Sequence, residues 1–138
     1  SVKSFIWSVP SFNELTREAQ KVDRDNRFTI DGAQQVPYVT QCLEGAKGPV
    51  IAATDYIRNY AEQIRKYVPA RYEVLGTDGF GRSDSRNELR VFFEVNANYI
   101  AFTALKALVD EGSLEGKILT DAVTQLGIDA NKPNPMYS

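Results

Sequence analysis

The sequence predicts an α/β protein with a parallel sheet. Short strand-like runs alternate with amphipathic segments along the 138 residues, a pattern typical of parallel strands joined by helical crossovers. The run 49–54 (PVIAAT) is apolar without alternation, as expected of a strand buried on both faces. Two S-x-x-E capping boxes, beginning at Ser11 and Ser85, predict the starts of two helices.

The first part of the chain predicts a strand and then a helix. Residues 4–9 (SFIWSV) are rich in aromatic and β-branched types, so we expect a strand there with Trp7 in the core. The capping box at Ser11 opens a helix expected to reach about Val22. The polar stretch 23–35 lacks periodicity and predicts a loop.

The middle of the chain predicts two further helix–strand pairs. A short amphipathic helix over 37–44 precedes the buried strand at 49–54. Asp55 is the expected cap of a helix over 57–68, whose apolar residues recur at helical spacing. A third strand is expected at 72–75.

Three helices are predicted to close the chain after a glycine-rich segment, over residues 88–95, 99–111 and 114–126. We expect one domain over 1–130 and an extended tail over 131–138. The aromatic residues at helical spacing are interpreted as core rather than as a cofactor site: Tyr56, Tyr60, Phe92, Phe93 and Tyr99. Three strands are few for a doubly wound sheet.

Charge and hydropathy argue against two classes of partner. The 16 basic and 18 acidic residues are spread along the chain and leave a formal charge of -2, so no basic face is available for nucleic acid. No polybasic segment suits an anionic membrane, and no apolar run approaches the ~20 residues that span one.

The absence of histidine is the most restrictive feature of the composition. It excludes Ser-His-Asp and Cys-His nucleophilic sites, most zinc sites and the two-histidine iron site. The single cysteine, Cys42, excludes an internal disulfide and fits a reducing compartment, from which we expect a cytoplasmic location. Cys42 lies among apolar residues and is interpreted as a packing residue.

The glycine-rich segment Gly76–Ser85 (GTDGFGRSDS) is the strongest candidate for chemistry. It follows a predicted strand and precedes a predicted helix, where α/β sheets place their ligands. Its G-x-x-G-x-G spacing differs from the dinucleotide motif, and it lacks the G-x-x-x-x-G-K-[ST] phosphate loop. One hypothesis is therefore a stand-alone domain that binds a small anion or nucleotide here.

The same segment also fits a structural turn or a partner surface. Arg82 and Arg86 could form surface ion pairs with Asp78 and Asp84. Such pairs do not explain a phenylalanine between glycines, and an exposed Phe80 would suit a protein interface.

Five segments, in this order, carry a family resemblance: 12–15 (FNEL), 36–39 (VPYV), 48–56 (GPVIAATDY), 75–86 (LGTDGFGRSDSR) and 128–135 (IDANKPNP). Together they resemble the C-terminal domain of the homodimeric, bacterial-type pyruvate dehydrogenase decarboxylating component. The match covers nearly the whole chain. More distantly, the order strand–Gly-x-x-Phe-Gly-x-Ser–helix is similar to the last domain of transketolases.

The resemblance implies a transketolase C-terminal-like α/β/α sandwich of three layers. It implies a parent enzyme that uses thiamine diphosphate and magnesium to decarboxylate pyruvate and to acetylate a lipoyl group on dihydrolipoyl acetyltransferase. Two earlier domains would bind those cofactors across a homodimer interface. This chain would then be a scaffold and dimer-interface domain that packs on the rest of its subunit and is inactive alone.

No catalytic, cofactor-binding or metal-binding residue is expected on this chain from the resemblance. The residues that carry over do so only as members of a family loop expected to face the interface: Asp78, Phe80, Gly81, Arg82 and Asp84.

The resemblance also implies that the fold is incomplete. The family's domain has a strand and a helix before the point that corresponds to Ser1, and that strand would lie between the strands predicted at 4–9 and 49–54. Two unpaired strand edges would favour aggregation. We therefore expect a fragment completed by another chain, by an upstream segment or by rearrangement.

Overall fold

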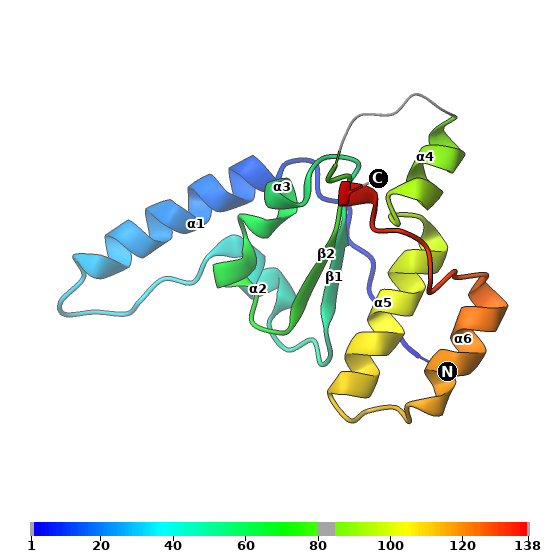
Figure 1. Cartoon of the computed structure of the whole chain (residues 1–138). Coiled ribbons are helices and arrows are strands. Elements are labelled where there is room, and N and C mark those ends of the chain that lie inside the picture. The colour runs from blue at the N-terminus through cyan, green and yellow to red at the C-terminus, as the bar shows by residue number, and fades with distance from the viewer. Residues whose placement is uncertain (1, 80–84, 138) are drawn as a thin grey trace.

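The computed structural model describes residues 2–79 and 85–137, and it confirms the α/β class (Figure 1). Within these residues the sheet has two strands, β1 (Val50–Ala53) and β2 (Tyr72–Leu75). They are parallel, as the sequence predicted, with Val50 opposite Tyr72 and Ala53 opposite Leu75. The expectation that β1 is buried on both faces was wrong, because its first three residues are half-buried and Ala53 is exposed. A sheet this small agrees with the expectation of an incomplete fold.

Helices lie on both sides of the sheet and form the outer two of three layers (Figure 1). The helices on one side are α1 (Phe12–Arg27), α2 (Tyr38–Leu43), α3 (Arg58–Glu62) and the 3-10 helix η1 (Arg65–Tyr67). Those on the other side are α4 (Arg86–Phe92), α5 (Ala97–Asp110) and α6 (Lys117–Leu126). The tail ends in a second 3-10 helix, η2 (Pro135–Tyr137).

Both predicted capping boxes are present. The Ser11 hydroxyl accepts the N–H of Glu14 at 3.1 Å and begins α1, and the Ser85 hydroxyl accepts the N–H of Glu88 at 3.3 Å and begins α4. The expected end of α1 at Val22 was wrong, because the helix continues through part of the predicted loop.

Polar contacts stabilise the last turns of α1. The sequence there shows no apolar periodicity, which is why the helix was expected to end earlier. Asp23 accepts hydrogen bonds from Lys66 at 2.7 Å and from the Tyr67 hydroxyl at 2.9 Å. These bonds join α1 to η1 across more than 40 residues of sequence. Lys21 and Asp25 add an ion pair along the helix. Tertiary contacts therefore stabilise the end of this helix.

The strand predicted at 4–9 was wrong. Residues 2–9 have no regular structure, and their side chains are exposed, Phe5 by 81% and Ile6 by 94%. Trp7, expected in the core, is 56% exposed. A strand requires a neighbour to take its hydrogen bonds, and no described strand pairs with this segment.

The main core lies between β2 and the α1–α3 layer. Its buried members are Phe12, Val39, Ala61, Ile64, Val68, Tyr72 and Val74. The Tyr72 hydroxyl donates a buried hydrogen bond to the Ala61 carbonyl at 2.8 Å, and burial raises the pKa of this phenol well above its usual value. The rings of Phe12 and Tyr60 pack edge to face, 5.3 Å apart.

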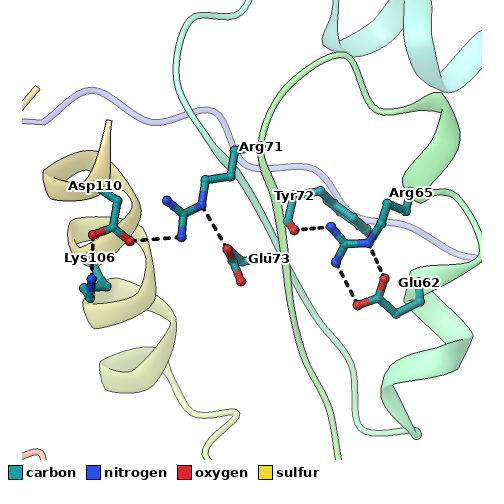
Figure 2. A network of polar contacts seen from close by, with 7 residues as sticks. All are labelled: Glu62, Arg65, Arg71, Tyr72, Glu73, Lys106 and Asp110. Atoms are coloured by element: carbon teal, nitrogen blue, oxygen red, sulfur yellow. Dashed lines mark hydrogen bonds and ion pairs between the residues drawn. The ribbon is translucent and has the colours of Figure 1, made fainter. Parts of the chain in front are cut away.

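Two arginines near β2 connect the sheet to the helices on either side of it (Figure 2). Arg65 binds both carboxylate oxygens of Glu62, at 2.5 and 2.8 Å, and donates to the Tyr72 carbonyl at 2.7 Å. The helix predicted over 57–68 is shorter than expected, since α3 ends at Glu62 and the 3-10 helix η1 begins at Arg65 after a turn.

Arg71 makes the second connection, between β2 and α5 (Figure 2). It donates to Glu73 at 2.9 Å and to Asp110 at 3.1 Å, and Lys106 donates to the other Asp110 oxygen at 2.5 Å. These side chains are partly exposed, so the pairs orient α5 more than they stabilise it.

Candidate functional site at the carboxyl end of the strands

The segments that follow β1 and β2 are bonded to each other. The N–H of Thr77 donates to the Tyr56 carbonyl at 2.9 Å, and the Thr77 hydroxyl donates to the Asp55 carbonyl at 2.9 Å. Parallel strands end at the same edge of a sheet, so these two turns lie side by side. The edge is where α/β proteins place their functional loops.

Asp78 joins the turn after β2 to the start of α3. One carboxylate oxygen accepts the backbone N–H of Arg58 and the other accepts its Nε, both at 2.7 Å. Partial burial raises the pKa of Asp78, but the hydrogen bonds from Arg58 outweigh it and the net pKa lies below the usual value. Among the described residues the partner of the Asp78 carboxylate is Arg58, and the suggested pairing of Asp78 with Arg82 falls on a residue outside the described ranges.

Asp55 does not cap the helix that follows β1, so that prediction was also wrong. Its carboxylate instead accepts two hydrogen bonds from Arg90 of α4, at 2.9 and 3.3 Å. The bond from Arg90 lowers the pKa of Asp55, and the charge of Arg86 lowers it further. The pair attaches α4 to the end of β1.

Gly76 permits the close approach of the two turns. A Cβ at this position would lie 2.8 Å from both the Cγ and the backbone nitrogen of Arg58, and 2.9 Å from the Tyr56 carbonyl oxygen. Two of these atoms belong to the backbone and cannot move aside. The first glycine of the predicted loop is therefore required by packing.

The C-terminal tail returns to this edge of the sheet (Figure 1). A Cβ at Gly79 would lie 2.6 Å from the Pro135 carbonyl oxygen, and Gly79 has a φ of +123°. Lys132 donates to the Phe92 carbonyl at 2.6 Å and lies 3.5 Å from a carboxylate oxygen of Glu94. The tail therefore contacts both the turn after β2 and the end of α4.

Exposed apolar side chains lie beside the Arg58–Asp78 pair. Tyr56 is 67% exposed and Ile57 is 57% exposed, and the Tyr56 ring is 5.1 Å from that of Tyr60. The expectation that Tyr56 belongs to the core was wrong. Its position a few residues after the parallel strand β1 was the available signal, because such residues leave the sheet at its functional edge.

A cleft of about 530 Å³ opens at the same edge, between the end of β1, α4 and the start of α5. Its apolar lining is Ala53, Val91, Val95, Ala97 and Ile100. Its polar lining is Thr54, Asp55, Asn87, Arg90 and Asn96. No motif in the sequence predicts this cleft, because its walls come from three separate segments.

Four of the five predicted interface residues lie outside the described residues: Phe80, Gly81, Arg82 and Asp84. Asp78 is described, and it gives the loop a carboxylate that is already bonded to Arg58. Among the described residues, no three cysteine or carboxylate side chains are grouped as metal ligands. No helix within 2–79 and 85–137 is both long and apolar enough to cross a membrane.

Comparison with known proteins agrees with the resemblance found in the sequence. The family described as transketolase-like TK C-terminal domain matches residues 1–96. Proteins named pyruvate dehydrogenase E1 component are 53% identical over 95% of this chain in Pseudomonas aeruginosa and 50% over 98% in Cupriavidus necator. The Escherichia coli protein of that name is 47% identical over 97%. The chain spans about 15% of the length of these relatives.

Proposed function

Because the chain belongs to the transketolase-like C-terminal domain family, we propose that it is the non-catalytic C-terminal domain of a pyruvate dehydrogenase E1 component. The observation that carries this proposal is the 53% identity to such a protein over 95% of the chain. The longer protein would decarboxylate pyruvate and acetylate a lipoyl group of dihydrolipoyl acetyltransferase. A cytoplasmic location belongs to the same proposal.

The cofactors of that reaction, thiamine diphosphate and magnesium, would be held by other parts of the longer protein. Magnesium binds through carboxylates whose oxygens are available at one place. At the carboxyl end of the strands, Asp55 is bonded to Arg90 and Asp78 to Arg58, each through both oxygens. These two aspartates are therefore engaged with arginines rather than available to magnesium.

The role proposed for this domain is to pack on the rest of its subunit and on the homodimer mate. Support comes from the exposed Tyr56 and Ile57, which stand on turns that are fixed by the Arg58–Asp78 pair. Apolar side chains on a rigid edge suit a protein interface. The loop residues 80–84 continue from this edge in the sequence.

Ile57→Asp in the complete subunit tests the interface. We expect weaker dimerisation by light scattering, with lower activity at low protein concentration that recovers at high concentration. Ile30→Asp is the matched control. Ile30 is 91% exposed on the segment after α1, which is not part of this edge of the sheet. Unchanged dimerisation of the Ile57 variant would contradict the interface role and leave the family membership intact.

A second test concerns the apolar residues of segment 2–9. Phe5, Ile6 and Trp7 are exposed here, and we propose that another part of the longer protein covers them. Size-exclusion chromatography with light scattering should show association or precipitation of this chain alone. The chain with the preceding strand and helix of the longer protein attached should be a well-behaved species. A stable, cooperative monomer of the short chain would contradict the proposal.

A further inference from the structure

We propose that the cleft between the end of β1, α4 and the start of α5 binds a small organic anion. The ligand would carry one negatively charged head group and an apolar body of a few carbon atoms. The cleft's volume of about 530 Å³ lies within the range of small-molecule sites, ~300–1,000 Å³. Its position beyond the carboxyl end of β1 is where open α/β sheets bind ligands.

The apolar wall of the cleft is suited to the body of such a ligand. Val95, just before α5, is 5% exposed and forms the buried part of this wall. Ile100, one turn further along, is half-buried, and Val91 of α4 is 43% exposed. An apolar group placed between these side chains would remove their remaining surface from water, which is favourable.

The charges of the cleft favour a negative head group. Arg90 lines it directly, and Arg86 lies one turn before Arg90 on the same helix, close enough to lower the pKa of Asp55. Asp55 is the only acidic residue among the described lining residues. The charges of Arg90 and Asp55 in the lining balance, and Arg86, just outside the lining, adds a positive charge near Asp55.

Arg90 retains donors for a ligand while it is bonded to Asp55. The two bonds to Asp55 use its Nε and Nη2 atoms. A guanidinium has five N–H groups, so three remain, two on Nη1 and one on Nη2. Asp55 thereby fixes the orientation of the guanidinium plane, and an anion can approach from its other side. The Asn87 amide, exposed at the rim of the cleft, offers a further donor.

This site is independent of the reaction proposed for the longer protein, because every group that it uses lies on this chain. Carboxylates and phosphate esters share the required chemistry. Benzoate and phenyl phosphate therefore serve as two probes with one apolar body, and benzamide is their neutral control.

The test is hydrogen exchange and calorimetric titration of the complete subunit with each probe. We expect benzoate, phenyl phosphate or both to bind saturably and to slow exchange over residues 86–100. Benzamide should bind at least about tenfold more weakly, because it lacks the charge-assisted hydrogen bond. The tighter of the two anions identifies the head group.

Two variants of the cleft are expected to change the affinity for the anion in opposite directions. Arg90→Gln should weaken anion binding at least about tenfold. Asp55→Asn should tighten it severalfold, because it removes the charge that repels an anion while its amide oxygen can still accept a hydrogen bond from Arg90. Arg17→Gln, on exposed α1, makes the same change of net charge and should leave binding unchanged.

Val91→Glu is a second variant that tests the cleft even if Arg90→Gln fails to fold. Val91 is partly exposed, so the fold should tolerate a charged residue there. The glutamate of Val91→Glu should repel anions and weaken their binding, whereas the uncharged control Val91→Gln should not. The proposal is overturned if neither anion slows exchange over 86–100, if benzamide binds as tightly as benzoate, or if Arg90→Gln and Val91→Glu both leave binding unchanged.

Discussion

Asp78 accepts hydrogen bonds from both the backbone and the side chain of Arg58. One of its carboxylate oxygens accepts the Arg58 backbone N–H and the other accepts the Arg58 Nε, each at 2.7 Å. The two residues are 20 positions apart, so the turn after β2 caps the helix that follows β1. This pair connects the turn after β2 to the start of the crossover between β1 and β2, at the edge where the candidate interface lies.

Asp78→Ala should destabilise α3 locally by about 1–2 kcal/mol, the usual cost of losing a helix cap. Asp78→Asn is the matched control, because an amide oxygen can still accept the Arg58 N–H without the charge. Native-state hydrogen exchange of residues 58–64 in the complete subunit measures the local stability of α3 in both variants. Equal protection in Asp78→Ala and the wild type would show that the cap contributes nothing.

Gly76→Ala should cost about 1–3 kcal/mol, because its methyl group would overlap backbone atoms of Tyr56 and Arg58. Gly116→Ala provides the comparison, since Gly116 has a helical φ of -59° and open space around it. That change should be neutral or stabilise by up to about 1 kcal/mol. Denaturant unfolding of the two variants should therefore give shifts of different size, and a neutral Gly76→Ala would contradict the close approach.

Lys132→Met should loosen α4 at its end. The substitution keeps an apolar stem but removes the hydrogen bond to the Phe92 carbonyl and the cation 4.9 Å from the Phe92 ring. The side chain is 17% exposed, so we expect a loss of about 1–2 kcal/mol. Faster exchange of residues 89–95 is the readout. Lys117→Met, on the exposed start of α6, should leave that segment unchanged, and equal rates in both variants would contradict the role of the tail.

Acid should destabilise the fold through five carboxyl groups. Hydrogen bonds from basic partners lower the pKa of Asp23, Asp55, Glu62, Asp78 and Asp110, outweighing the effect of burial at Asp78. A folded-state pKa below the unfolded value contributes stability above the unfolded pKa of about 4, and this stability is lost as the pH falls through the folded value.

Denaturant unfolding at a series of pH values should therefore show constant stability from neutral pH to about pH 5 and a decline below about pH 4. Asp78→Asn should make the decline shallower because one of the five groups is removed. A stability that rises on acidification through this range would contradict the predicted sign.

Much of the fold could be predicted because its signals are local. The apolar run that becomes β1 and the capping boxes at Ser11 and Ser85 each lie within a few consecutive residues. The end of α1 was missed because Asp23 is held by Lys66 and Tyr67, which are far away in sequence. The segment 4–9 has the composition of a strand, yet composition cannot supply the neighbouring strand that it needs.

The candidate site was predicted in position but not in detail. A ligand or interface was expected at the carboxyl end of the strands, and the segment after β2 was correctly identified as part of that edge. Tyr56 was assigned to the core because its spacing fits a helix, but the chain leaves β1 through a turn that exposes it.

The sequence by itself determined the family, the class of fold and the parallel strands, because these depend on motifs and periodicity within short windows. Only the tertiary structure decided that Asp78 rather than Asp55 caps α3, that Asp55 pairs with Arg90 of α4, and that a cleft opens between the end of β1, α4 and the start of α5. Both aspartates directly follow strand segments, so nothing local distinguishes them. Their partners are set by which segments the sheet brings to one edge, and that is a property of the folded chain.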